Sequence, residues 1–146
     1  MMADRIFVDT NILINAVVPE SPQYFHARGI LRRLERSESE MWLSRQVLRE
    51  FLSALTRPQS FAQRYPLAEL LQDAKEYERQ FVVAEDHDLV TQQLYLLLEQ
   101  VPCGGKQIHD ANIVATMLTF NIPQLVTYNL ADFNRFAGLI EVVSGL

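Results

Sequence analysis

The sequence is poor in cysteine and has no long apolar run. Cys103 is the only cysteine among the 146 residues, so the chain cannot form an internal disulfide. Neither this cysteine nor the three histidines have the spacing of a zinc site. The densest apolar stretch, residues 94–98, is far shorter than the roughly 20 residues that span a bilayer. We therefore expect a cytoplasmic protein without a membrane partner, rather than a disulfide-rich secreted one.

Glycine, proline and positive charge are also scarce. The chain has 5 Gly and 6 Pro and no internal repeat or linker, which indicates a folded chain. Its length suits one domain, so we expect residues 1–146 to form a single domain. The net charge of −5 argues against non-specific nucleic-acid binding through a large basic surface. However, 11 of the 13 basic residues are arginine, the type that binds phosphate through two hydrogen bonds.

Short β-like runs alternate with longer helix-like segments along the chain. The apolar runs predict strands at residues 6–8, 41–43, 81–83, 125–126 and 140–143. Helical spacing and breaker residues predict helices at about residues 21–36, 45–57 and 86–101, another helix after Pro66 and one from about His109. A further short helix is expected to begin near Asn11. This alternation predicts an α/β fold in which a parallel sheet has helices on both faces.

Local signals predict where some helices begin and end. Ser21 and Pro22 suggest an N-cap followed by proline at the first helical position. Ser44 is the expected N-cap of the next long helix, and Pro58 is expected to end it. Residues 103–106 contain two glycines and predict a loop.

Asp9 directly follows the first predicted strand. In α/β sheets, ligands bind at the carboxyl ends of the strands, so Asp9 is a candidate ligand. An N-cap role for Asp9, in a helix that begins near Asn11, is an equally good interpretation.

Glu50 and Asp110 lie beside the apolar faces of two predicted helices. A charge in such a place must be neutralised, either by a cation or by an ion pair, here with Arg45 or Arg49. Asp110 is also near a helix N-terminus, where the helix dipole favours a carboxylate, so capping remains an alternative. Three acids in such positions nevertheless point to a shared site.

The segment after the fourth predicted strand offers a hydroxyl, an amide and a carboxylate, from Thr127, Asn129 and Asp132. Such oxygen ligands suit Mg²⁺ or Mn²⁺, although an Asx-type turn would explain them too. In extended backbone, Thr127 and Asn129 point to the same side, whereas Asp132 is reached only after a turn. We expect Asn129 to lie nearer a metal, and Asp132 to act on the loop or its waters.

Four segments, in this order, combine an apolar run with a polar or acidic residue: Phe7–Ile14, Ser44–Phe51, Ile108–Ala115 and Leu125–Phe133. Their order, spacing and flanking apolar residues resemble the four signature blocks of PIN domains, and most of all those of VapC-type toxins. The resemblance extends over nearly the whole chain. It implies a three-layer α/β/α sandwich with a parallel sheet of about five strands.

The resemblance also implies site residues. The family's metal-binding and catalytic acids correspond to Asp9, Glu50 and Asp110, with Asn129 as a further metal ligand and Asn11, Thr127 and Asp132 in support. Asn129 stands where many relatives carry an aspartate, which leaves open whether one or two metals bind. An amide binds a cation more weakly than a carboxylate does.

The implied activity is that of a Mg²⁺- or Mn²⁺-dependent endoribonuclease, which cleaves RNA with a metal-activated water. The implied partners are RNA, a small antitoxin protein and further copies of the chain in a homodimer or higher oligomer. Arg45 and Arg49 are candidates for holding RNA phosphates, with pairing to Glu50 as the alternative. Four apolar residues are a candidate docking surface, with ordinary core as the alternative: Leu94, Tyr95, Leu97 and Leu98.

Other classes of function fit less well. A PIN nuclease that is not a toxin, or a PIN-fold binding protein without catalysis, remains an alternative, although the presence of all three acids argues against the latter. A phosphatase or receiver would use Asp9 as a nucleophile or phosphate acceptor. Such a phosphatase needs a second carboxylate two residues later, where this chain has Asn11, and a receiver needs paired acids elsewhere.

Overall fold

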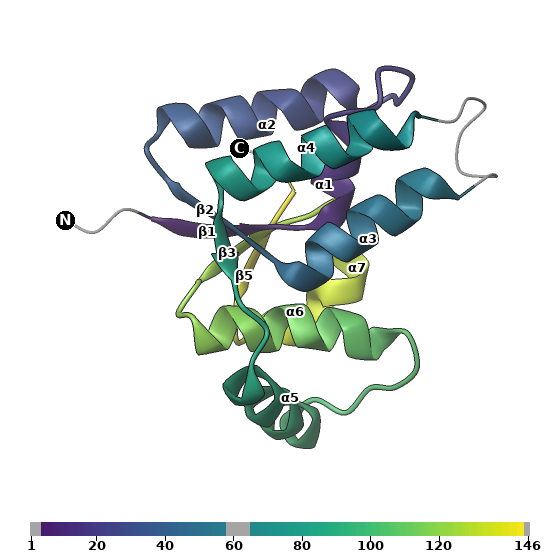
Figure 1. Ribbon diagram of the computed structural model, residues 1–146. Helices are drawn as coiled ribbons and strands as arrows, with labels where there is room; N and C mark the ends of the chain where they lie inside the picture. The colour runs from purple at the N-terminus through teal and green to yellow at the C-terminus, as the bar shows by residue number, and fades with distance from the viewer. Residues whose placement is uncertain (1–3, 58–64, 145–146) are drawn as a thin grey trace.

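The computed structural model describes residues 4–57 and 65–144, and a five-stranded sheet lies at its centre (Figure 1). The strands are β1 (Arg5–Val8), β2 (Glu40–Ser44), β3 (Val82–Ala84), β4 (Gln124–Val126) and β5 (Glu141–Val143). Their order in the sheet is β3-β2-β1-β4-β5, and all neighbouring strands are parallel. The prediction of a parallel sheet is confirmed.

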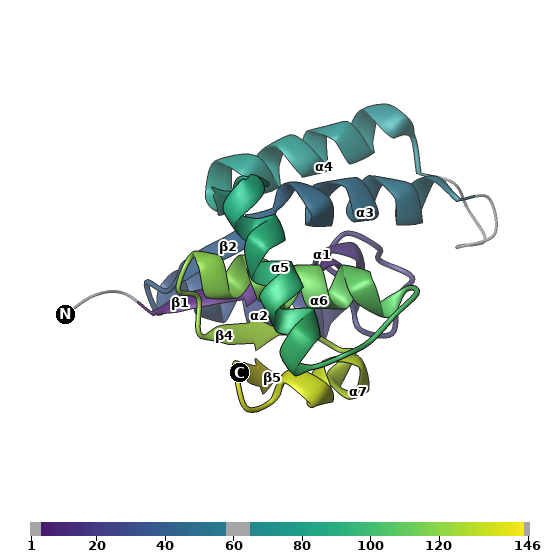
Figure 2. The same cartoon turned by 90° about the horizontal axis from the view of Figure 1, so that it is seen from below.

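Helices cover both faces of this sheet. They are α1 (Thr10–Asn15), α2 (Tyr24–Arg36), α3 (Arg45–Thr56), α4 (Leu67–Gln80), α5 (Asp88–Gln100), α6 (Gln107–Thr119) and α7 (Leu130–Phe133), followed by the 3₁₀ helix η1 (Asn134–Phe136). In Figure 1, α2 and α4 lie above the sheet, and α5 and α6 lie below it. Figure 2 shows α5 crossing α6, on which it packs. The three-layer α/β/α arrangement is therefore confirmed.

The central strand β1 is buried along most of its length. Ile6, Phe7 and Val8 are each at most 1% exposed, as expected for a parallel strand covered on both faces. Strand order reverses at β1, because β2 and β3 lie on one side of it and β4 and β5 on the other. Ligand sites in α/β proteins form at such a reversal, beyond the carboxyl ends of the strands.

The register of β1 and β4 brings two site segments together. Val8 lies opposite Val126, and the backbone N–H of Asp9 donates to the Val126 carbonyl at 3.0 Å. The residues that follow these strands, Asp9 and Thr127, therefore leave the sheet side by side.

Helix α2 begins later than the sequence suggests. Its N-cap is Gln23, and the Ser21 hydroxyl does not cap it. Instead, Ser21 Oγ accepts from the Gln23 N–H at 3.1 Å, and the Ser21 carbonyl accepts from the Tyr24 N–H at 3.1 Å. The prediction of an N-cap at Ser21 is wrong, because these hydrogen bonds form a turn ahead of the helix.

Helix α3 begins as predicted. Ser44 Oγ accepts from the Val47 N–H at 3.3 Å, which is the expected N-cap contact. The helix ends at Thr56, while Pro58, its predicted stop, lies outside the described residues. Helix α6 starts at Gln107, two residues before the predicted start at His109.

The candidate docking residues on α5 divide between core and surface. Leu97 is 1% exposed, and Leu94 and Leu98 pack partly against the core, so these three follow the alternative interpretation as core. The fourth candidate, Tyr95, is 63% exposed, and Leu96, which was not a candidate, is 53% exposed. Within the described ranges, no helix is long and apolar enough to cross a membrane.

Candidate active site

A cleft of about 550 Å³ opens beyond the carboxyl ends of β1 and β4. Among the residues that line it are Asp9, Thr10, Asn11, Glu50, Asp110 and Asn129. These residues come from the β1–α1 junction, α3, α6 and the loop after β4. The fold thus brings the three predicted acids and the predicted amide into one cleft, although Glu50 comes 41 residues after Asp9 and Asp110 comes 60 residues after Glu50.

Asp9 is buried at the base of this cleft and is 6% exposed. Its Oδ1 accepts from the Thr10 N–H at 2.8 Å, and its Oδ2 accepts from the Thr127 hydroxyl at 2.7 Å and the Asn11 amide at 3.3 Å. The carboxylate is the N-cap of α1 and also faces the cleft. The N-cap interpretation of Asp9 is therefore confirmed, and its place in the cleft keeps it a candidate ligand.

Asn11 and Thr127 connect α1 to the loop after β4. The Asn11 amide donates to Thr127 Oγ1 at 3.1 Å, and its Oδ1 accepts from the Tyr128 N–H at 3.1 Å. Thr127 Oγ1 also accepts from the Asn129 N–H at 3.0 Å, and the side chain is fully buried. These bonds orient Asp9 and fix the backbone on which Asn129 sits.

Glu50 reaches the cleft from α3. Its Oε2 accepts from the Thr10 hydroxyl at 3.0 Å, and its Oε1 accepts from the Gln46 amide at 2.9 Å. Within the described part of the chain, no arginine pairs with Glu50, so the alternative of an ion pair with Arg45 or Arg49 is wrong. The Glu50 carboxylate is therefore held by neutral donors.

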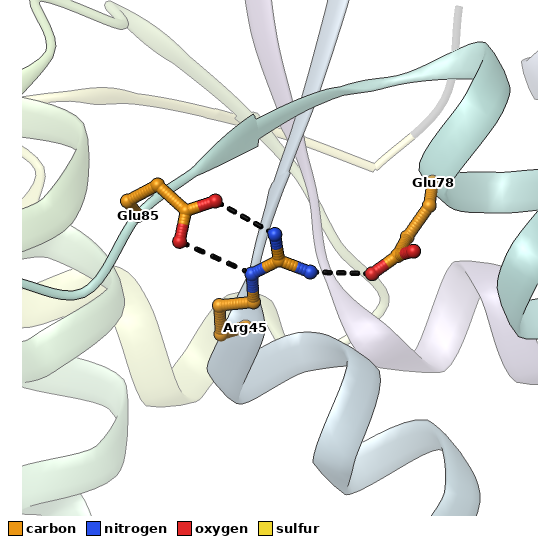
Figure 3. Close-up of polar contacts among 3 residues, drawn as sticks. All are labelled: Arg45, Glu78 and Glu85. Carbon is orange, nitrogen blue, oxygen red and sulfur yellow. Dashed lines mark hydrogen bonds and ion pairs between the residues drawn. The ribbon is translucent and has the colours of Figure 1, made fainter.

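Arg45 is instead engaged on the outer side of α3 (Figure 3). Its Nε and Nη2 donate to the two oxygens of Glu85 at 3.2 and 2.7 Å, and its Nη1 pairs with Glu78 of α4. This geometry joins α3, α4 and the end of β3. A guanidinium held by two carboxylates is a poor candidate for binding phosphate.

Two cations that the sequence analysis missed line the cleft. Arg57 follows the last residue of α3, and Lys106 directly precedes α6. Neither stood out in the sequence, because no local pattern distinguishes a basic residue at a cleft rim from one on any solvated surface.

Burial and repulsion between like charges raise the pKa of two acids of the cleft, Asp9 and Asp110. Burial raises the pKa of Asp9 to about 6 against hydrogen bonds from Thr127 and Thr10, and the charges of Glu50 and Asp132 add to the rise. Burial also raises the pKa of Asp110 to about 6, aided by the charges of Asp132, Asp9 and Glu50 and opposed by Arg135. These carboxylates thus share one region of negative potential.

Asp132 contributes to this potential from outside the cleft lining. It lies in α7, is exposed, and is the charged group with the largest effect on the pKa of Asp110. Asn129, by contrast, lines the cleft itself. The structure therefore brings Asp132 into electrostatic range of the other acids without making it part of the wall.

The side chains of the cleft are the oxygen ligands that hard cations prefer. Within residues 4–57 and 65–144, no three His, Cys, Asp or Glu side chains already lie close enough to enclose a metal ion. Asp9 and Glu50 are held by hydrogen-bond donors, and the negative charges of the neighbouring acids raise the pKa of Asp9 and Asp110. A divalent cation would relieve this repulsion, so the residues present fit Mg²⁺ or Mn²⁺.

Comparison with known families agrees with this geometry. Residues 6–139 match the PIN domain family. The chain belongs to the PIN domain family. PIN domains are typically nucleases that use divalent metals. No curated protein is significantly similar to this sequence.

Solved VapC toxins share the PIN fold seen in this chain. The VapBC2 structure from Rickettsia felis, bound to promoter DNA, aligns with a TM-score of 0.68 and 20% identity over 96% of this chain and 99% of that one. Mycobacterium tuberculosis VapC20, a sarcin-ricin loop cleaving toxin, aligns with a TM-score of 0.66 and 18% identity over 92% of this chain and 95% of that one. DNA-bound VapBC from Salmonella typhimurium aligns with a TM-score of 0.69 and 18% identity over 97% of this chain and 98% of that one. At these identities the likeness concerns the fold.

Proposed function

We propose that this chain is a Mg²⁺- or Mn²⁺-dependent endoribonuclease and that residues 1–146 act as one nuclease domain. The observation that carries the proposal is the meeting of Asp9, Glu50 and Asp110 in one cleft of a PIN domain. These three carboxylates would hold the cation, and Asn129 would add a neutral ligand.

The residues around the acids would keep them ready for the cation. Thr127, Asn11 and Thr10 hold the Asp9 carboxylate by donating to it, so its oxygens keep one orientation in the metal-free protein. When bound, a divalent cation supplies an activated water and neutralises charge on the phosphate. The burial of Asp9 at the base of the cleft would limit the access of other water to that carboxylate.

Arg57 and Lys106 would bind the RNA backbone. Both line the cleft, where a phosphodiester must lie to approach the acids. Arginine and lysine neutralise phosphate charge, and they would also offset the negative potential of the acids.

RNA cleavage by the purified protein tests this proposal. We expect cleavage with Mn²⁺ and none with EDTA. Asp9→Asn and Asp110→Asn remove ligand charge at nearly constant volume. Loss of a residue that only hydrogen-bonds to a metal ligand lowers activity by roughly 10- to 100-fold, so each of these variants should lower the rate of RNA cleavage by more than that.

The matched control for these variants is Tyr77→Phe. It removes a buried hydrogen bond to the Leu13 carbonyl, and because neither residue lines the cleft, the variant should keep full activity. Undiminished cleavage by either aspartate variant would refute the proposed site. A wild-type protein that binds RNA but does not cleave it with Mn²⁺ would favour a PIN-fold binding protein.

We further propose that the chain is the toxin of a VapBC-type pair, with a small antitoxin and a second copy of the chain as partners. The support is the likeness to VapC20 and to VapBC complexes, in which toxin and antitoxin were solved together. Exposed apolar side chains on α5, including Leu89, Tyr95 and Leu96, offer surface for contact with a protein.

Growth on induction tests the toxin role. Expression of the wild-type chain should arrest bacterial growth, whereas Asp9→Asn should not. Sedimentation of the purified protein should show a dimer or higher oligomer. Normal growth, a dilute monomer and no small protein encoded beside the gene would exclude the toxin role and leave the nuclease proposal standing.

A further inference from the structure

Gln46 is a buried polar side chain one helical turn before Glu50 on α3. It is 9% exposed, and all of its amide hydrogen-bonding groups are used. Its Nε2 donates to Glu50 Oε1 at 2.9 Å and to the His109 carbonyl at 3.1 Å, while its Oε1 accepts from the Asn112 amide at 2.8 Å. One side chain thus joins α3 to the first turns of α6.

The chemistry of the partners determines the orientation of this amide. The Glu50 carboxylate and the His109 carbonyl can only accept, so the NH₂ group of Gln46 must face them. A reversed amide would place its oxygen against two acceptors and its NH₂ against the Asn112 donor. The side chain is therefore locked in one orientation.

Two hydrogen-bond partners of Gln46 lie on either side of Asp110 in the sequence of α6. His109 comes directly before Asp110 and Asn112 comes two residues after it, and Gln46 bonds to both while it also holds Glu50. The remaining Glu50 oxygen is held by Thr10, the residue after Asp9. The hydrogen bonds of Gln46 thereby fix the position of Glu50 on α3 relative to the segment of α6 that carries Asp110.

We infer that Gln46 is a positioning residue, which sets the place of the Glu50 carboxylate relative to Asp110 and so the affinity of the cleft for a divalent cation. For this last consequence the inference rests on the proposed function. Partners that orient metal ligands commonly contribute about 10- to 100-fold to metal affinity.

Gln46→Met tests the inference, because methionine has a similar length and shape without the amide. Mn²⁺ binding to the folded protein, measured by calorimetry, should be about tenfold weaker than in the wild type. Tyr77→Phe, which also loses a buried hydrogen bond, should bind Mn²⁺ as the wild type does. Equal Mn²⁺ affinity in Gln46→Met and the wild type would overturn the inference.

Asn112→Ala provides a second variant, since it removes one of the three hydrogen-bond partners of the Gln46 amide and leaves Glu50 and the His109 carbonyl in place. It should weaken Mn²⁺ binding in the same direction by a smaller factor, even where Gln46→Met folds poorly. An unchanged affinity in folded Asn112→Ala would contradict the role given to the bridge.

A double-mutant cycle separates this inference from the proposed function. In metal-free protein, urea unfolding of Gln46→Met, Glu50→Met and the double variant should give non-additive changes, because the two side chains contact each other. Additive changes would overturn the positioning role. If the wild type bound no Mn²⁺, the proposed function would fail, and this cycle would still decide whether Gln46 positions Glu50.

Discussion

Asp9 combines deep burial with a location among other negative charges. It receives three hydrogen bonds, yet burial dominates and raises its pKa to about 6 from an ordinary 3.8. The folded, metal-free protein therefore binds a proton at Asp9 more readily than the unfolded chain does. A side chain that weakens folding in this way is typical of functional sites.

The free energy of unfolding of the metal-free protein should depend on pH through this group. Between pH 3.8 and about 6, the folded protein binds more protons at Asp9 than the unfolded chain, so stability falls as pH rises, by up to about 3 kcal/mol. Asp110 acts with the same sign. Urea unfolding in EDTA from pH 4 to 7 measures this dependence.

Asp9→Asn is the matched variant for this measurement. It should flatten the pH dependence and be more stable than the wild type at pH 7, because it removes a buried charge and its repulsion from the neighbouring acids. Saturating Mn²⁺ should stabilise the wild type more at pH 7 than at pH 4.5. Wild-type stability that rises steadily from pH 4 to 7 would contradict this electrostatic account.

Variants of Asn129 and Asp132 should show which of these residues is the fourth metal ligand. Asn129 lines the cleft, whereas Asp132 is exposed on α7 and acts on Asp110 through its charge. We expect Asn129→Asp to keep or tighten Mn²⁺ binding, because a carboxylate binds a cation more strongly than an amide does. Asp132→Asn should lower RNA cleavage only partly.

Calorimetry with Mn²⁺ and cleavage rates of these two variants check that assignment. Loss of Mn²⁺ binding in Asp132→Asn, with no effect of Asn129→Asp, would reverse it. Such a result would also strengthen a mechanism with two metals, since it would give the site a fourth carboxylate ligand.

The acids could be predicted from the sequence because each occupies an anomalous local position. Asp9 follows a buried strand, and Glu50 and Asp110 stand beside apolar helix faces. Gln46 could not be recognised, since its partners on α6 lie more than 60 residues away and only the fold brings them together. Arg57 was missed because no local pattern distinguishes a basic residue at a cleft rim from one on any solvated surface.

At the scale of elements, α3 supplies several parts of the site from one rigid helix. Ser44 caps its start, Gln46 and Glu50 face α6 and the cleft, and Arg45 ties its outer side to Glu85. The position of Glu50 therefore depends on how both sides of α3 are anchored.

Substitution of the basic residues should separate anchoring from RNA binding. Arg57→Ala and Lys106→Ala should raise KM for RNA several-fold and weaken its salt dependence, because both residues line the cleft. Arg45→Met should change KM little, because its guanidinium is paired with Glu78 and Glu85. Cleavage kinetics at several salt concentrations measure the difference, and a larger KM effect at Arg45 than at Arg57 would refute it.

The strands and most of the long helices lie close to their predicted positions, whereas the short helix α7 was not predicted and the start of α2 was misplaced. The buried run of β1 and the capped start of α3 follow directly from local sequence. Helix α7 has four residues and no side-chain cap, so it left no periodic signal. The start of α2 was misplaced because Ser21 uses its hydroxyl in a turn.

At the scale of the whole molecule, the strand order of the sheet determines where the cleft forms. The reversal of strand order at β1 brings the ends of β1 and β4 together, and α3 and α6 reach the same point. The alternation of strands and helices predicted a parallel sheet, but the pairing of β1 with β4 depends on long-range contacts. A chain with a net charge of −5 thereby gathers its acids where one cation would be strongly attracted.

The position of bound Mn²⁺ in a crystal of the wild-type protein tests the central claim most directly, because anomalous scattering identifies the ion and its ligands. We predict Mn²⁺ in the cleft with oxygen ligands from Asp9 and Asp110, and no such ion in Asp9→Asn crystals grown in the same way. A cleft without Mn²⁺ at a concentration that supports RNA cleavage, or Mn²⁺ bound only elsewhere on the molecule, would contradict the account.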